Sequence, residues 1–82
     1  MSYYEEFAAQ HFGTHMTDAD WRVEVAEWIK SHPTEAGDEL AQHMDDDFVA
    51  KLLTAPELFA QDCFEILCSH IRVQAMKALE DL

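Results

Sequence analysis

Basic residues are scarce in this sequence of 82 residues: five Lys and Arg stand against 17 Asp and Glu, giving a formal net charge of −12 at pH 7. So few cations exclude direct binding to nucleic acid, whose phosphates are held mainly by Lys and Arg. Residues 1–47 carry twelve acidic and two basic residues, whereas residues 48–82 carry five and three. The charge is therefore concentrated in an acidic front half, and its field favours basic protein surfaces as partners.

Glycine and proline are also rare, with two of each, and the sequence has no low-complexity run. Hydrophobic residues make up 49% of the chain, which is enough for a packed core and too much for a disordered acidic tail. The longest apolar runs are a few residues, so no membrane span is predicted. The first residues lack the basic and apolar regions of a secretory signal. We therefore expect one domain over residues 1–82, located in the cytoplasm.

The cysteines are few as well, and both lie in one predicted helix. Cys63 and Cys68 are five residues apart, so their side chains point about 140° apart and differ in height by about 7.5 Å. This geometry excludes a disulfide between them unless the helix unwinds. We expect free, buried thiols.

Two helices are predicted before Pro33, which prevents continuation. Residues 3–12 place aromatic and small apolar side chains on one side. Thr17 begins the second helix, because its hydroxyl and the carboxylate of Asp20, three residues later, form a near relative of a capping box. This helix is expected to end at about Ser31.

The second predicted helix has two contrasting sides. At about 100° per residue, one arc of about 100° is mainly apolar and contains Trp21, Val25, Trp28, Ile29 and His32. A separate arc of about 60° contains Asp20, Glu24, Glu27 and Ser31. We expect the first arc to face the core and the second to present a column of carboxylates.

Two shorter elements and one long helix follow. Residues 34–43 are predicted to form a third helix, and residues 48–53 a short fourth helix or turn. Asp45, Asp46 and Asp47 lie between them as a break that can also cap the next element. The predicted fold class is all-α: a small bundle of four to five helices with a long C-terminal helix.

The C-terminal helix begins at Thr54-Ala55-Pro56-Glu57, which combines an N-cap threonine, an early proline and a carboxylate three positions later. No breaker follows, so the helix covers about residues 55–81 and measures about 39 Å, longer than a domain of this size needs. We interpret it either as the central helix of the domain or as part of a dimer interface. The seam that such a dimer would use contains Phe64, Leu67, Ile71, Ala75 and Ala78.

The acidic surface is the strongest candidate for function. Carboxylates one helical turn apart lie about 5–6 Å from each other, and rows of them can occupy a basic groove in place of phosphates. The residues predicted to bind a partner are Asp20, Glu24, Glu27, Asp38, Glu39, Asp45, Asp46 and Asp47. The competing interpretation is a solvated face that maintains solubility, although like charges at i,i+4 cost stability.

Metal binding and catalysis are not predicted. Glu39 and His43 have i,i+4 spacing, but zinc sites usually need three or four ligands, and the cysteines lie on another helix. The aspartate run at 45–47 lacks the Gly and terminal Glu of an EF-hand loop. The sequence has no phosphate loop, nucleophile elbow or metalloprotease motif. We expect no metal, no cofactor and no enzymatic activity.

In composition, the chain looks like small acidic accessory proteins of phages and mobile elements, which include anti-CRISPR proteins and DNA mimics. No motif carries this resemblance. Our leading hypothesis is a non-catalytic, acidic protein-binding module that inhibits a basic nucleic-acid-handling protein, as a phage-encoded anti-defence protein would. The alternative is a small structural or regulatory protein that forms a homodimer through its C-terminal helix.

Overall fold

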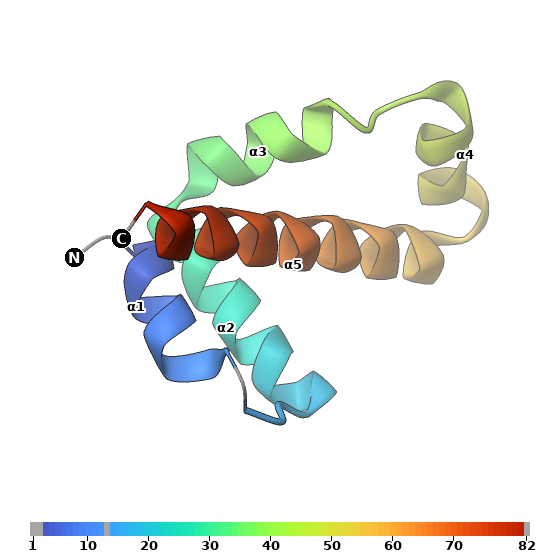
Figure 1. Cartoon of the computed structure of the whole chain (residues 1–82). Helices are drawn as coiled ribbons and strands as arrows, with labels where there is room; N and C mark the ends of the chain where they lie inside the picture. The colour runs from blue at the N-terminus through green and yellow to red at the C-terminus, as the bar shows by residue number, and fades with distance from the viewer. Residues whose placement is uncertain (1–2, 13, 82) are drawn as a thin grey trace.

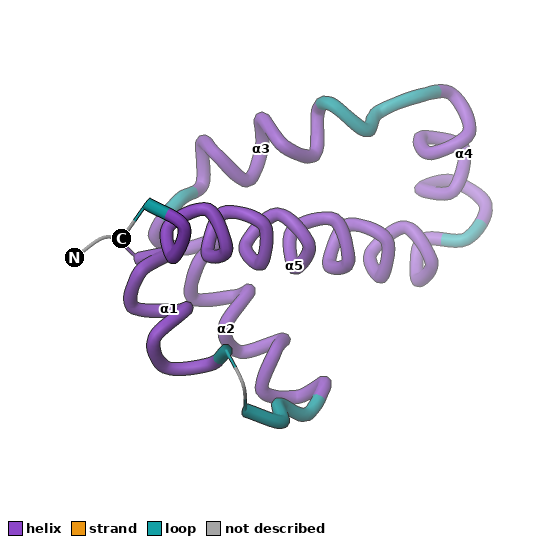
Figure 2. The backbone as a smooth tube through the Cα atoms, in the orientation of Figure 1, coloured by secondary structure: helices purple, strands orange, loops and turns teal. Residues whose placement is uncertain are grey.

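The computed structural model describes residues 3–12 and 14–81, which form helices and connecting loops without a strand (Figures 1 and 2). In chain order, the helices are α1 (Tyr3–His11), α2 (Asp18–Ser31), α3 (Pro33–Ala41), α4 (Asp46–Thr54) and α5 (Pro56–Glu80). The predicted all-α fold with a long C-terminal helix is confirmed. In addition, α5 is one continuous helix of 25 residues.

The long helix α5 is the axis of the molecule. Each of the other helices contacts it, and α2 also contacts α1 and α3 (Figure 1). At about 1.5 Å per residue, α5 is about 37 Å long, close to the longest dimension of the molecule, 42 Å. It therefore runs the length of the domain as its central helix.

Two helix starts follow from local sequence. The Thr17 hydroxyl accepts a hydrogen bond from the Asp20 N–H (3.2 Å), and an Asp20 carboxylate oxygen accepts one from the Thr17 N–H (3.3 Å). This is the predicted capping box. At α4, Asp45 accepts from the Phe48 N–H at 2.7 Å, which confirms that the aspartate run caps the next helix.

The predicted N-cap of the last helix is wrong. Thr54 lies inside the last turn of α4, where its hydroxyl donates to the Ala50 carbonyl oxygen at 2.9 Å. The N-cap of α5 is Ala55, which provides no side-chain hydrogen bond. Since α4 continues to Thr54, its hydroxyl is used within that helix. Pro56 and the first-turn carboxylate of Glu57 supply the favourable start of α5.

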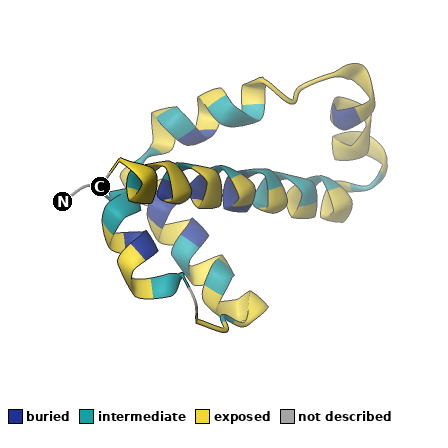
Figure 3. Ribbon diagram, in the orientation of Figure 1, coloured by how far each residue is buried: buried dark blue, intermediate teal, exposed yellow. Residues whose placement is uncertain are grey.

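The core lies where α1 and α2 cross the C-terminal half of α5 (Figure 3). Trp28 from α2 and Ile71 from α5 are its largest fully buried side chains. The predicted apolar arc of α2 is only partly buried, because Ile29 is 36% exposed and Trp21 is half-buried with the Arg72 guanidinium 4.2 Å from its ring centre.

The cysteines are free thiols, as predicted. Cys68 is buried in the core and Cys63 is half-buried. Burial raises the pKa of both thiols above the ordinary value. A raised pKa disfavours the reactive thiolate, so these side chains act as packing groups.

The two halves of α5 have different surroundings. Its buried residues are confined to Leu67, Cys68, Ile71 and Ala75. The N-terminal half carries α4, which is held by the contact of Phe48 with Phe59, whose ring centres are 4.9 Å apart. Residues 56–66 of this half accordingly include no fully buried side chain (Figure 3).

Replacing Ile71 by Ala should lower the free energy of unfolding by about 2–5 kcal/mol, because it leaves a cavity at the centre of the core. Chemical denaturation followed by circular dichroism measures the change. The matched control is Met76→Ala on the same helix, an exposed position, where we expect a change within about 0.5 kcal/mol. Equal losses in the two variants would contradict the assignment of the core.

Candidate functional site: a groove between α3, α4 and α5

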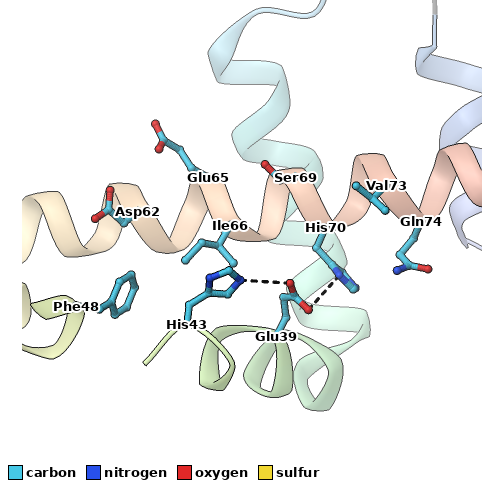
Figure 4. A pocket seen from close by; sticks show the side chains of 10 residues that line it. All are labelled: Glu39, His43, Phe48, Asp62, Glu65, Ile66, Ser69, His70, Val73 and Gln74. Carbon is cyan, nitrogen blue, oxygen red and sulfur yellow. Dashed lines mark ion pairs between the residues drawn. The ribbon is translucent and has the colours of Figure 1, made fainter. Parts of the chain in front are cut away.

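A groove of about 640 Å³ opens along the side of α5 that faces α3 and α4 (Figure 4). Its apolar surface comes from Phe48, Ile66 and Val73. Figure 4 shows Glu39 and His43 on the α3 side, while Glu65 and Ser69 project from the opposite edge of α5. The groove thus combines an apolar wall with polar rims.

Carboxylates dominate the charged lining of the groove. Glu39, Asp62 and Glu65 contribute to it, and no Lys or Arg lies among the described lining residues. Lys51 of α4 reaches Asp62 with its ammonium nitrogen 2.7 Å from the carboxylate oxygen. The hydrogen bond to Asp62 and its negative charge raise the Lys51 pKa above its ordinary value, and the charges of Asp45 and Asp47 add to this effect.

His70 ties α5 to α3 through two carboxylates. Its Nε2 lies 2.8 Å from Glu35 Oε1, and its Nδ1 lies 3.3 Å from Glu39 Oε2. The other oxygen of Glu39 lies 3.6 Å from Nε2 of His43, so this carboxylate is shared between two imidazoles (Figure 4).

Glu35 connects this bridge to the core. The Tyr4 hydroxyl donates to Glu35 Oε1 at 2.5 Å and accepts from the Trp28 indole N–H at 3.3 Å. Burial raises the pKa of the Glu35 carboxyl, but the hydrogen bonds from Tyr4 and His70 outweigh it and hold the pKa below the ordinary value. Glu35 is therefore a structural carboxylate that joins α1, α3 and α5.

The predicted carboxylates of α2 are largely engaged within the chain. Asp20 completes the capping box. Glu24 accepts from the Tyr3 hydroxyl at 3.3 Å and lies 3.4 Å from Nε2 of His11. Glu27 is exposed and lies 3.8 Å from the Lys30 ammonium. Glu27 is thus the most accessible member of this set.

The predicted carboxylates around α3 and α4 are mostly exposed. Asp38, Asp45, Asp46 and Asp47 are exposed, and Glu39 is half-buried in the bridge with His70. In Figure 1 the start of α2 lies below α5 and the α3–α4 connection lies above it. The N-terminal end of α2 and the α3–α4 connection thus lie on different sides of α5 in this view.

Sequence reasoning missed three carboxylates of this region: Glu35, Asp62 and Glu65. Glu35 precedes Glu39 by one helical turn, so the i,i+4 pattern could have placed both on one face of α3. The same spacing rule puts Asp62 and Glu65 near each other on α5. Their position opposite α3 depends on how the helices dock, which periodicity does not reveal.

The proposed dimer seam is used largely inside the single chain. Leu67, Ile71 and Ala75 are buried against the other helices, and Phe64 and Ala78 are half-buried. The Arg22 guanidinium lies 5.8 Å from the centre of the Phe64 ring. An interface between two folded chains would consequently involve the exposed side of α5.

A scan of the chain against protein-family models and searches of curated proteins and solved structures found no match. No helix within residues 3–12 and 14–81 is both long and apolar enough to cross a membrane. The same ranges contain no group of three or more His, Cys, Asp or Glu side chains placed to hold a metal ion.

The lowered pKa of Glu35 predicts a pH dependence of stability. A carboxyl whose folded-state pKa lies below its unfolded value stabilises the fold at neutral pH. This contribution is lost as the pH falls from about the ordinary value of 4.5 through the lower folded-state value. Glu35→Gln should therefore lose less stability than the wild type over this interval, as measured by urea unfolding at each pH.

The matched control for that comparison is Glu80→Gln, at an exposed position in the last turn of α5. We expect it to retain the acid sensitivity of the wild type. If Glu35→Gln and the wild type lost stability to the same extent on acidification, the hydrogen-bonded carboxylate would not be the source of that sensitivity.

Proposed function

We propose that this protein is a non-catalytic, acidic protein-binding module that occupies the nucleic-acid site of a basic protein and thereby inhibits it. The observation that supports the proposal is the exposure of Asp38, Asp45, Asp46 and Asp47 around the α3–α4 connection. Exposed like charges within a few residues repel one another, and a basic surface relieves that repulsion.

The four exposed aspartates around the α3–α4 connection, which we call the α3–α4 cluster, form a better contact surface than the carboxylates of α2. The cluster consists of Asp38, Asp45, Asp46 and Asp47. Asp38 and Asp47 directly precede the lining residues Glu39 and Phe48 in the chain, and the groove lining adds further carboxylates. By contrast, Asp20 and Glu24 of α2 are engaged by hydrogen bonds within the chain, and Glu27 lies near Lys30. We therefore assign the main contact to α3 and α4 and a secondary one to Glu27.

The proposed partner is a protein that handles nucleic acid in the cytoplasm, because such proteins present Lys and Arg at the spacing of phosphates. Competition for that surface blocks nucleic acid without any chemistry on either protein. A phage-encoded inhibitor of host defence is one protein class in which this mechanism fits. Binding should weaken steeply with salt, since exposed charges are screened within about 10 Å at about 0.1 M.

Three charge reversals of equal size test the proposal: Asp38→Lys in the α3–α4 cluster, Glu27→Lys on α2, and Glu80→Lys as the control outside both. The wild type is immobilised, and proteins captured from lysate are eluted between about 50 and 300 mM NaCl and identified. We expect Asp38→Lys to lose binding of the captured partner and Glu27→Lys to bind it more weakly. Glu80→Lys should bind it as the wild type does.

The decisive readout is inhibition. Purified partner should release its nucleic acid when wild-type protein is added, and Asp38→Lys should lose this effect while its helix content by circular dichroism is unchanged. Equal behaviour of Asp38→Lys and Glu80→Lys would show that only net charge matters, and the proposal would then fail.

A second candidate function, a homodimeric structural or regulatory protein, is favoured by the apolar side chains on the outside of the molecule. The exposed apolar residues of α4 and α5 are Val49, Leu52, Leu53, Leu58, Val73, Met76 and Leu79. Such side chains are enriched at protein interfaces when they lie together. Under this reading the acidic clusters maintain solubility.

A dimer formed through α5 should dissociate when Met76, which is 56% exposed, is replaced by Glu. Light scattering at about 100 μM measures the mass, because association depends on concentration. The neighbouring exposed position provides the control, Lys77→Glu, which changes charge without removing apolar surface. A wild-type protein that is monomeric at this concentration would count against the dimer.

A further inference from the structure

We propose that the groove between α3, α4 and α5 receives an arginine side chain of the partner together with an apolar side chain beside it. This inference rests on the proposed function and adds to it the chemistry of the recognised segment. The occupant is a short stretch of a basic protein, helical or extended, that displays Arg next to a residue such as Leu.

The size of the groove suits side chains rather than a folded surface. Its volume of about 640 Å³ lies within the range of about 300–1,000 Å³ that is typical of small-ligand pockets. A few side chains of one segment fill such a volume. The exposed aspartates of the α3–α4 cluster can then contact the rest of the partner outside the groove.

The carboxylates of the lining favour a cation as the occupant. Glu39, Asp62 and Glu65 contribute three carboxylates without a Lys or Arg among the described lining residues. Glu39 is shared by two imidazoles, and Glu65 has a 3.5 Å contact with the amide of Gln61. Glu65 and Asp62, one helical turn apart, are thus the carboxylates that an incoming cation can reach, Asp62 by displacing Lys51.

A cation of the chain itself already lies on one of these carboxylates. Lys51 contacts Asp62 at 2.7 Å, and its side chain is 46% exposed. An exposed pair of this kind contributes little to stability, so a competitor can displace it. Arg is the stronger competitor, because its planar guanidinium offers five donors and binds carboxylates with two parallel hydrogen bonds.

The apolar wall distinguishes an amphipathic segment from a simple cation. Val73 is 48% exposed and Ile66 is half-buried along the groove, with Phe48 at one end (Figure 4). An arginine covers part of this surface with its methylene stem, and an adjacent apolar side chain covers the rest. Apolar contacts ringed by charged groups are typical of the energetic centres of protein interfaces.

The test uses a fluorescent helical peptide of Leu and Arg as the probe, with fluorescence polarisation as the readout. The control peptide carries citrulline, a neutral isostere, in place of every Arg. We expect the wild-type protein to bind the Arg peptide at least about tenfold more tightly than the citrulline peptide. Equal binding of the two peptides, or no binding of either, would overturn the inference.

Two pairs of matched variants locate the binding. Ser69→Arg should weaken binding of the Arg peptide at least about tenfold. The new side chain lies one turn after Glu65 and competes with the peptide for the Glu65 carboxylate. Ser31→Arg makes the same change at an exposed position of α2 and should have no more than a small effect. Lys51→Ala should tighten binding about two- to fivefold by freeing Asp62, whereas Lys30→Ala, which frees Glu27, should not.

The outcomes separate this inference from the proposed function. If Ser69→Arg and Ser31→Arg had equal effects, or Lys51→Ala and Lys30→Ala did, only the net charge of the protein would matter. Binding of the peptide in the groove would then be refuted. If Asp38→Lys abolished inhibition of the partner while Ser69→Arg did not, the proposed function would stand without the groove. If the groove bound the peptide but no nucleic acid were displaced from a partner, the groove would stand without the proposed function.

Discussion

The structure depends on the packing of four short helices against one long one. Trp28 and Ile71 are buried where α2 meets α5, and α1 closes the same core from another side. Burial of large apolar side chains is the main favourable term in folding a small domain. Since α5 is longer than this core, its N-terminal half is available to carry α4, and the groove opens along it. The groove thus follows from a mismatch in helix length.

Polar contacts hold α3 in place, because its apolar packing is weak. Helix α3 buries only Ala36 among its described residues, so it has little apolar surface with which to hold α5. His70 compensates by bridging Glu35 and Glu39, and Tyr4 extends the bridge to Trp28. Partly buried carboxylates of this kind stabilise the fold only because each has a hydrogen-bonding partner. The position of α3, and with it one rim of the groove, depends on these bonds.

The acidic residues therefore serve two purposes. Glu24, Glu35 and Glu39 connect helices, whereas Asp38 and Asp46 are exposed to solvent. Charge reversal has a different meaning in the two groups, because it breaks an internal contact in the first and alters only the surface in the second. This division is the reason to look for a partner at the α3–α4 end of the molecule, where exposed carboxylates and accessible apolar side chains lie close to the same groove.

Local sequence by itself determined the helical class, the approximate extent of each helix, and the caps at Thr17 and Asp45, because these depend on residues within four positions of each other. It failed at Thr54, where two helices compete for one residue. Only the tertiary structure decided that Ile71 packs within the chain, that Glu35 pairs with His70, and that Asp62 lines the groove. These outcomes depend on how α5 is shared among its neighbours, and periodicity gives the faces of a helix but not the partner that each face meets.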